Sequence, residues 1–187
     1  MNDSDAIALL RPAVVPAPDA RWADLGAGTG TFTRALAALL GPSADLYAVD
    51  RDEHALRSIR AWADRTSDAP SIHILTADFT ARLPLPRLDG IVLANALHFV
   101  RDQAAAMALA ASYLRPGGRL VAIEYEDRPR SRWVPHPVSS TRFAELADGA
   151  GLGPARVVAT RPSAFGGSMY VSVAVSVRRC GVAGGIS

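Results

Sequence analysis

Three alternating glycines between an apolar run and a helix-like segment constrain this chain of 187 residues more than any other feature. They lie in the stretch Asp24-Leu25-Gly26-Ala27-Gly28-Thr29-Gly30. Glycine lets the backbone turn tightly and approach a ligand closely, and a helix that follows directs its unpaired N–H groups and the positive end of its dipole at that ligand. The pattern therefore predicts a nucleotide-binding turn. A merely tight connection between a strand and a helix is the alternative.

The spacing of the glycines differs from the dinucleotide-binding pattern. That pattern, G-x-G-x-x-G, needs a glycine at position 31, where this chain has Thr31. The order here is D-x-G-x-G-x-G, and the acidic Asp24 at its start suits a ligand with an amino group better than a pyrophosphate. A nicotinamide-dependent dehydrogenase is accordingly disfavoured.

Length, composition and charge predict one globular domain. Hydrophobic residues make up 49% of the chain, which suits a packed core, and the formal net charge of +2 is too small for the basic patch of a dedicated nucleic-acid binder. The amino end is acidic where a secretory leader is basic, and no apolar run reaches the roughly 18 residues that span a bilayer. The single Cys180 can form no internal disulfide. We therefore expect a cytoplasmic protein without membrane contact.

Strand-like and helix-like segments alternate along the chain, which is typical of a parallel sheet covered by helices. Strands are expected at residues 21–25, 46–49, 72–76, 88–94 and 119–125. Helices are expected at residues 5–10, 31–40, 52–63, 102–114 and 141–150. Two further strands, 156–160 and 169–177, form a hairpin around Gly166-Gly167, in which valines alternate with small residues. We expect the glycine-rich tail 178–187 to fray.

The order of these elements and the residues at the strand ends resemble the class I S-adenosylmethionine-dependent methyltransferases over residues 19–177. Besides the glycine motif, the resemblance rests on Asp50, Ala77-Asp78-Phe79, Asn95-Ala96-Leu97-His98 and the turn 114–120. It implies an α/β fold with a Rossmann-like, seven-stranded sheet that is mostly parallel, with an antiparallel C-terminal hairpin and helices on both faces. The tetrapeptide Asn-Ala-Leu-His and the turn Leu-Arg-Pro-Gly-Gly look most like the small-molecule branch that includes quinone-biosynthesis methyltransferases.

For S-adenosylmethionine, and for its product S-adenosylhomocysteine, the resemblance implies a site at the carboxyl ends of the strands. In this scheme Asp50 accepts hydrogen bonds from the ribose hydroxyls, Asp78 accepts from the adenine amine, and Asp24 faces the methionine ammonium. The other residues expected around the cofactor are Gly26, Ala27, Gly28, Gly30, Arg51, Ala77, Phe79, Asn95 and Ala96. A charge that starts a helix at Asp50 and an Asx turn at Asp78 are the alternatives.

Methyl transfer in this family is an in-line displacement, so alignment in a water-poor pocket does most of the work. A base is needed only if the acceptor must lose a proton. His98, just past the fourth strand, is the leading candidate for that base, and packing against the next helix is its alternative role. Glu124 and Tyr125 are further catalytic candidates at the end of the fifth strand, with Glu126 and His136 close by.

The expected acceptor is a small molecule with an O, N or C nucleophile. The chain lacks the Asn/Asp-Pro-Pro-Tyr/Phe clamp of enzymes that methylate adenine or amide nitrogens. Asn95 is a poorer ligand for a hard cation than a carboxylate, so we expect no metal. The first helix, the loop 126–139 or a second subunit must roof the pocket, which leaves a homodimer or a partner chain open.

Two other functions remain open from the sequence. Methylation of RNA is favoured if the arginines of the loop near Trp133 join more distant ones in a single basic face, a set made of Arg128, Arg130, Arg132, Arg161, Arg178 and Arg179. The small size also fits a catalytically silent cofactor-binding subunit of a larger complex. Two other histidines, His54 and His73, are expected to be structural.

Overall fold

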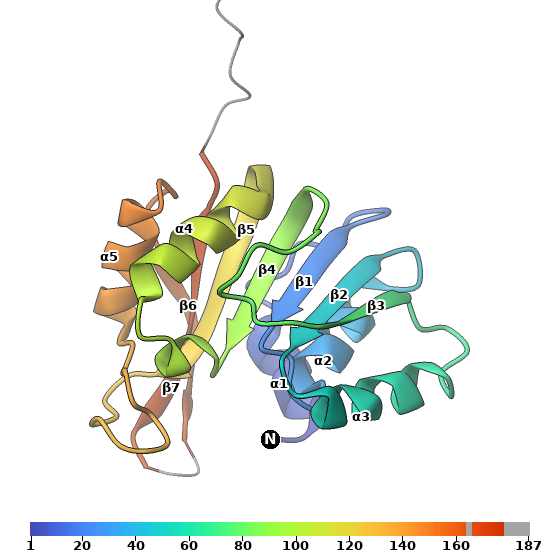
Figure 1. Ribbon diagram of the computed structural model, residues 1–187, viewed down its shortest axis with the longest axis horizontal. Helices are drawn as coiled ribbons and strands as arrows, with labels where there is room; N and C mark the ends of the chain where they lie inside the picture. The colour runs from blue at the N-terminus through green and yellow to red at the C-terminus, as the bar shows by residue number, and fades with distance from the viewer. Residues whose placement is uncertain (164–165, 178–187) are drawn as a thin grey trace, which may run out of the picture.

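The computed structural model describes residues 1–163 and 166–177, in which helices cover both faces of a seven-stranded sheet (Figure 1). The strands are β1 Arg21–Leu25, β2 Asp45–Asp50, β3 Ser71–Thr76, β4 Leu88–Ala94, β5 Leu114–Tyr125, β6 Arg156–Pro162 and β7 Ser168–Val175. The helices are α1 Asp3–Leu10, α2 Thr31–Leu40, α3 Glu53–Ala63, the short 3₁₀ helix η1 Leu97–Phe99, α4 Gln103–Tyr113 and α5 Ser140–Gly149. The predicted fold class is thereby confirmed.

The strands follow the order β3-β2-β1-β4-β5-β7-β6 across the sheet. The five strands from β3 to β5 run parallel, and β7 pairs antiparallel with both β5 and β6. The strand order reverses between β1 and β4, and open parallel sheets bind ligands at the carboxyl ends of the strands beside such a point. The arrowheads of β1 and β4 point toward the lower edge of Figure 1, so the site is to be sought there.

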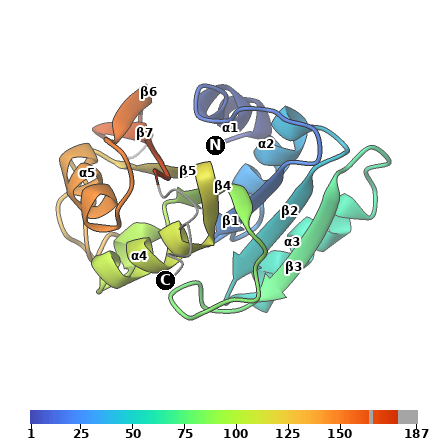
Figure 2. The ribbon, with the colours of Figure 1, turned by 90° about the horizontal axis from the view of Figure 1, so that it is seen from above.

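Two groups of helices cover the two faces of the sheet. α1 and α2 pack on one face through Leu10 and Leu36, and α3 covers the outer strands of the same face through Ile59. α4 and α5 pack on the opposite face through Met107 and Phe143. Figure 2, seen from above, shows α1 and α2 on one side of the sheet and α4 and α5 on the other.

β7 is an interior strand, and this explains why both of its faces are buried. Val171 and Val173 join the core beneath α1 and α2, whereas Tyr170 and Ala174 join the core beneath α4 and α5. The alternation that the sequence predicted for this arm of the hairpin is therefore confirmed. The two sets of side chains face two different cores, because β5 and β6 flank the strand.

The predicted elements differ from the structure mainly at their ends. α1 begins at Asp3, before the expected residue 5, because the side chain of Asn2 accepts a hydrogen bond from the Asp5 N–H and caps the helix. β5 begins at Leu114, earlier than the expected residue 119, since Leu114 already pairs with Leu88 before the register shifts. The turn expected at residues 114–120 therefore lies within the bounds of β5.

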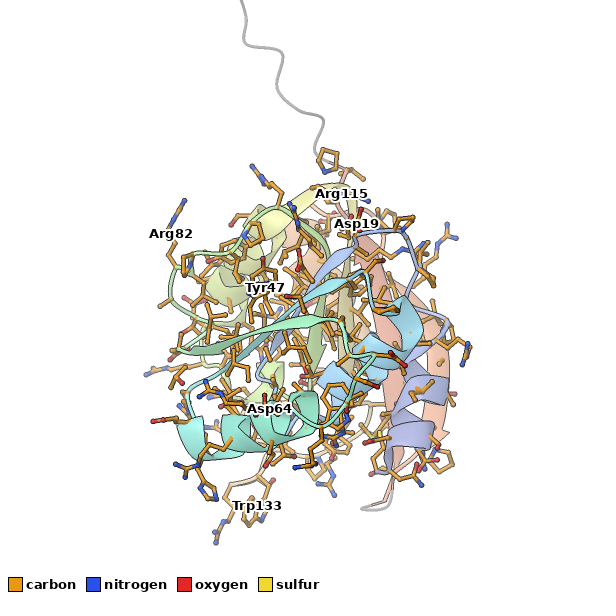
Figure 3. All side chains as sticks on the ribbon, turned by 90° about the vertical axis from the view of Figure 1, so that its right-hand side faces the viewer. Asp19, Tyr47, Asp64, Arg82, Arg115 and Trp133 are labelled. Atoms are coloured by element: carbon orange, nitrogen blue, oxygen red, sulfur yellow. The ribbon has the colours of Figure 1, made fainter. Side chains whose placement is uncertain are left out.

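The connection from β3 to β4 contains no helix among the residues that the structure describes. Residues 77–87 form a loop that is anchored by Leu83, whose N–H donates to the Tyr113 hydroxyl at 2.7 Å. The neighbouring part of the sheet carries Tyr47 of β2, which is labelled in Figure 3. Its ring stacks on that of His73 of β3, with ring centroids 4.6 Å apart. His73 thus lies partly exposed on an edge strand, where its Nε2 is 3.4 Å from Asp45.

Within residues 1–163 and 166–177, no helix has the length and the apolar content needed to cross a bilayer. The predicted tail 178–187, which includes Cys180, lies outside the described residues, as do residues 164 and 165 of the predicted hairpin turn.

Gly90 of β4 lies against the buried indole of Trp22 on β1, and a Cβ at position 90 would come within 2.4 Å of that ring. We expect Gly90→Ala to lower the free energy of unfolding by about 1 to 3 kcal/mol, because the packed core cannot move the ring aside without strain. Gly149→Ala in α5 is the matched control, since a Cβ there meets nothing within 4 Å. Urea denaturation measures both variants. Wild-type stability for Gly90→Ala would contradict this account of the packing.

Candidate functional site

The glycine motif forms the turn between β1 and α2 and passes close to the end of β4. Gly26 has a φ of 81°, and a Cβ there would lie 2.6 Å from the Cβ of Ala96, so this position requires glycine. Its N–H donates to the carbonyl of Val49 at 2.8 Å, which ties the turn to β2. Gly28 has a φ of 53°, and a Cβ there would meet nothing within 4 Å. The turn therefore leaves open space for a ligand in front of Gly28.

Asp50 at the end of β2 holds this turn in place. Its Oδ2 accepts a hydrogen bond from the N–H of Gly28 at 2.8 Å, and its Oδ1 accepts one from the N–H of Asp52 at 2.9 Å, just before α3 begins. A carboxylate oxygen has about two acceptor positions, so both oxygens can still accept from a ligand. Asp50 thus organises the start of α3, as the alternative interpretation expected, without using up its acceptor capacity.

Asp78, just after β3, forms the Asx turn that the alternative interpretation expected. Its Oδ1 accepts from the N–H of Thr80 at 2.9 Å and from the Thr80 hydroxyl at 2.7 Å. These hydrogen bonds hold the pKa of Asp78 below its ordinary value, so the side chain is ionised at neutral pH. Both turn contacts use Oδ1, which leaves Oδ2 for a ligand. The ring of Phe79 lies beside Gly26 and supplies an apolar surface next to this carboxylate.

Asp24, the acidic residue that opens the motif, is almost fully buried at the end of β1. Its Oδ2 accepts a hydrogen bond from the Thr33 hydroxyl at 2.7 Å, whereas its Oδ1 has no hydrogen-bond partner among the described residues. Burial raises the pKa of Asp24 to about 6, and the hydrogen bond from Thr33 acts in the opposite direction. A buried carboxylate oxygen without a partner is costly, and a cation nearby would stabilise it.

A cavity of about 790 Å³, called the first cavity below, opens at the carboxyl ends of β1 to β4. Its lining includes most residues predicted to bind the cofactor, namely Gly26, Gly28, Asp50, Arg51, Ala77, Asp78, Phe79, Asn95 and Ala96. Three others are placed elsewhere: Asp24 is buried against Thr33, Ala27 packs with α3, and Gly30 precedes α2 as its N-cap. The volume falls in the range of about 300 to 1,000 Å³ that is usual for small-molecule sites.

The first cavity has a further wall that the sequence did not predict. This wall comes mainly from the segment that leads into α4, together with two residues near Asp50 and Asp78; its members are Val100, Arg101, Asp102, Ala105, Ala106, Asp52 and Thr80. Asp52 and Asp102 are the N-caps of α3 and α4, and an aspartate just before a helix is a signal that the sequence does carry. Val100, Arg101, Ala105 and Ala106 line the cavity because of the path that the chain takes after η1.

Asn95 directly follows β4 in a left-handed backbone conformation, with a φ of 51°. Its N–H donates to the carbonyl of Ile123 at 2.8 Å, and its side-chain Oδ1 is buried without a hydrogen-bond partner among the described residues. Asparagine tolerates this backbone region better than most residues, yet such positions cluster at ligand sites. Asn95 lines the first cavity and also a second one beside it.

His98 and Glu124 form a buried pair between η1 and the end of β5. Nδ1 of His98 lies 2.6 Å from Oε2 of Glu124, and the two side chains are 3% and 1% exposed. Oε1 of Glu124 also accepts hydrogen bonds from the N–H groups of Leu97 and His98, at 3.1 and 3.3 Å. Burial raises the pKa of Glu124, and its hydrogen bond with His98 acts in the opposite direction. With Nδ1 directed at the carboxylate, Nε2 is the ring nitrogen left for a ligand.

The second cavity has a volume of about 520 Å³ and is rich in aromatic side chains. Its lining consists of Asn95, His98, Phe99, Tyr125, Arg128, Trp133 and Val134. Asn95 and Phe99 belong to the linings of both cavities, so the two cavities adjoin there. In Figure 3, Trp133 projects from the lower end of the molecule, opposite the end that carries Asp19 and Arg115.

The loop 126–139, one of the three covers that the sequence suggested for the pocket, contributes Arg128, Trp133 and Val134 to the lining of the second cavity. Glu126, a weaker catalytic candidate, accepts hydrogen bonds from the N–H and hydroxyl of Ser140 and so fixes the start of α5. His136 supports the site through its backbone, because its N–H donates to the carbonyl of His98 at 3.0 Å and its carbonyl accepts from Gln103. The leading helix α1 packs against α2, and none of its residues lines either cavity.

Across the part of the chain that the structure describes, no three His, Cys, Asp or Glu side chains gather closely enough to hold a metal ion. The acidic groups of the site instead accept hydrogen bonds from backbone N–H groups, hydroxyls or an imidazole. The absence of a metal from the working site stays a prediction.

A protein-family model described as a methyltransferase domain matches residues 23–118, which is just over half of the chain. The chain belongs to this family. Its predicted membership of the class I S-adenosylmethionine-dependent methyltransferases is thereby confirmed, and S-adenosylmethionine is its expected cofactor. The residues after 118, which hold Glu124, Tyr125 and the roof of the second cavity, lie beyond the matched segment.

Two kinds of relatives agree with this assignment. The chain is 36% identical over 70 residues to a probable cobalt-precorrin-6B C(15)-methyltransferase of Thermoplasma volcanium, covering 37% of this chain and 35% of that protein. It is 31% identical over 113 residues to the ubiquinone/menaquinone biosynthesis C-methyltransferase UbiE of Ectopseudomonas mendocina, covering 58% of this chain and 43% of that protein. The matches thus span less than half the length of either relative.

Solved structures share the fold over almost the entire chain. The YcgJ protein of Bacillus subtilis superposes with a TM-score of 0.75 at 13% identity, over 94% of this chain and 100% of that one. The N-methyltransferase NodS of Bradyrhizobium japonicum WM9 superposes with a TM-score of 0.74 at 20% identity, over 94% and 96% of the two chains. At these identities the likeness establishes the fold.

The raised pKa of Asp24 makes the stability of the ligand-free protein depend on pH. The folded state holds the proton more tightly than the unfolded state, so the stability that this proton provides is complete below pH 3.8 and is lost as the pH rises toward about 6. The difference corresponds to about 3 kcal/mol. Asp24→Asn keeps an acceptor for the Thr33 hydroxyl but cannot ionise, and we expect it to remove this fall in the free energy of unfolding.

Urea denaturation of both proteins between pH 4 and pH 7 checks this expectation. Asp64→Asn, an exposed carboxylate at the C-cap of α3, serves as the control and should leave the pH dependence nearly unchanged. Parallel stability curves for the wild type and Asp24→Asn would contradict a raised pKa at position 24.

Proposed function

We propose that this chain binds S-adenosylmethionine in the first cavity and transfers its methyl group to a small-molecule acceptor held in the second cavity. The observation that carries the proposal is that the two cavities adjoin at Asn95 and Phe99. A methyl donor and its acceptor must meet within a few ångströms in line with the bond that breaks. Two adjoining cavities at the carboxyl ends of the strands provide that arrangement.

The residues of the first cavity fit the parts of the cofactor. Asp50 offers acceptor positions on two oxygens, which suits a pair of ribose hydroxyls. Asp78 keeps Oδ2 available for an exocyclic amine, with Phe79 beside it as an apolar wall for a purine. The open space in front of Gly28 lets the ligand approach the backbone. S-Adenosylmethionine itself supplies the activated methyl group, carried on a positively charged sulfur.

Asp24 acts at longer range in this proposal. Its carboxylate does not line the first cavity, so it attracts the methionine ammonium as a negative charge behind the glycine turn. A cation there favours the ionised form of Asp24 and offsets the effect of burial on its pKa. Loss of this charge therefore weakens cofactor binding less than loss of Asp50, which faces the cavity directly.

The contacts of the arginines favour a small-molecule acceptor over RNA. Arg161, which the RNA hypothesis required, forms an ion pair with Asp5 at 2.9 Å. Arg178 and Arg179 lie outside the described residues. Within the loop, the guanidinium groups of Arg128 and Arg132 lie over the rings of Tyr125 and Trp133, at 4.8 and 4.5 Å from the ring centroids. RNA binding that weakens steeply with salt would favour the alternative.

A silent cofactor-binding subunit is the second alternative, and turnover separates it from an active enzyme. The proposal expects S-adenosylhomocysteine to form when the purified chain meets S-adenosylmethionine and a panel of phenols, amines and thiols. Tight binding of the cofactor with no product from any acceptor, until a partner chain is added, would favour the silent subunit.

Asp50→Ala tests the cofactor site. We expect it to weaken the binding of S-adenosylhomocysteine at least about 100-fold, because two hydrogen bonds to a charged acceptor are lost and each contributes about 1.5 to 3 kcal/mol. Asp45→Ala, at the other end of β2, is the matched control and should bind as the wild type does. Isothermal titration calorimetry measures both. An affinity of Asp50→Ala within threefold of the wild type would remove Asp50 from the proposed site.

A further inference from the structure

We propose that the methyl acceptor is a planar aromatic molecule with an ionisable hydroxyl group, and that His98 takes the proton of this hydroxyl during transfer. The inference rests on the proposed function, since it names the class of molecule held in the second cavity. Three features of that cavity carry it: the pairing of His98 with Glu124, the aromatic lining and the charge of the lining.

The pair of His98 and Glu124 is built to accept a proton from the cavity. The backbone N–H groups of Leu97 and His98 donate to Oε1 of Glu124, and Nδ1 of His98 lies 2.6 Å from Oε2. Two fixed donors favour the ionised form of Glu124, and in this proposal that carboxylate holds the proton of the imidazole on Nδ1. Nε2 then carries the lone pair of a ring that belongs to the lining of the second cavity. A carboxylate behind the imidazole also stabilises the imidazolium that forms when Nε2 takes a proton.

The lining of the second cavity favours a flat ring. Phe99, Tyr125 and Trp133 reach it from η1, from the end of β5 and from the loop 126–139. Phe99 and Trp133 are 52% and 66% exposed, so two of the lining aromatic side chains keep a large accessible surface, with Arg132 lying over the Trp133 ring. Exposed apolar surface that gathers at one hollow is typical of a binding site, and aromatic side chains pack best with another ring.

The charge of the cavity favours a neutral or anionic acceptor over a cationic amine. Among the lining residues that the structure describes, Arg128 is the only side chain with a permanent charge, and its guanidinium lies over the ring of Tyr125. The carboxylate of Glu124 is not part of the lining, and two backbone N–H groups and the imidazole of His98 surround it. A hydroxyl that becomes anionic as its proton leaves is stabilised next to a guanidinium, whereas an ammonium is repelled.

The step balances with the groups already named. The O–H bond of the acceptor breaks and its proton passes to Nε2 of His98. The hydroxyl oxygen forms a bond to the methyl carbon while the bond from that carbon to the sulfonium sulfur breaks, and the electron pair stays on sulfur. The products are an aryl methyl ether, S-adenosylhomocysteine and an imidazolium. The positive charge has moved from sulfur to His98, which returns its proton to water.

A spectroscopic experiment tests the proton transfer without turnover. The probe is 4-nitrophenol, whose phenolate absorbs visible light, added to protein saturated with S-adenosylhomocysteine at a pH where free nitrophenol is mostly neutral. We expect the phenolate band to grow as nitrophenol binds to the wild type, to be lost in His98→Gln and to be reduced in Glu124→Gln, because Glu124 positions the imidazole. His73→Gln, an exposed histidine on β3, is the control and should keep the band. No band with the wild type, or an unchanged band in His98→Gln, overturns the proposal.

Turnover with phenols of graded acidity provides a second measurement. We expect His98→Gln to lower kcat about 100-fold or more for weakly acidic phenols and less for acidic ones, because an acceptor that ionises readily needs less help from a base. A merely structural role of His98 predicts the same loss for every phenol. Methylation of benzylamine in preference to all the phenols overturns the assignment of the acceptor class.

Trp133→Ala keeps the proposal testable if His98→Gln fails to fold. Trp133 is largely exposed, so its removal leaves the core intact. We expect nitrophenol to bind about two- to tenfold more weakly to this variant through the loss of one aromatic contact, with S-adenosylhomocysteine binding unchanged. Equal nitrophenol affinity would contradict the aromatic site. Failure of S-adenosylhomocysteine to bind the wild type would instead overturn the proposed function, so the two failures are distinguishable.

Discussion

The carboxylate of Asp50 is the interaction on which the rest of the site depends. It joins the turn after β1 to the start of α3 by accepting hydrogen bonds from Gly28 and Asp52. Without this link the glycine turn would be held to β2 mainly by the two N–H groups that donate to Val49. Because both carboxylate oxygens are fixed by backbone donors, their remaining lone pairs point in set directions before any ligand arrives. The site is thus organised in advance, which lowers the entropy cost of binding.

Much of the fold could be predicted from the sequence because its signals are local. Position 26 requires glycine because Ala96 lies so close to it, and a glycine in such a motif indicates a close approach of this kind. Asp50 and Asp78 each stand just after a strand, and parallel strands bring their carboxyl ends to one edge of the sheet. Knowledge of the strand order was therefore enough to place these residues around one cavity. Their exact contacts, such as the Asx turn of Asp78, followed from short-range chemistry.

The acceptor side of the site was harder to predict because its contacts join distant parts of the chain. His98 and Glu124 were each candidates, but their pairing depends on the register between β4 and β5, which no local pattern reports. On the side of the first cavity, the wall formed by Val100, Arg101 and Ala105 likewise depends on how the chain enters α4. Glu126 illustrates the reverse case, in which a carboxylate near the strand ends is used to fix the next helix. Residue type alone does not separate these roles.

The position of β7 between β5 and β6 has a consequence for the order in which the molecule can be completed during synthesis. β5 carries Glu124 and Tyr125, yet its outer edge is satisfied only by residues 169–175, which the ribosome makes some fifty residues later. β6 is made before β7 but pairs with no other strand. Until β7 has left the ribosome, the outer edge of β5 and the whole of β6 have no strand partner. Unpaired strand edges can pair with other chains. That half of the sheet is therefore complete only once β7 has been made.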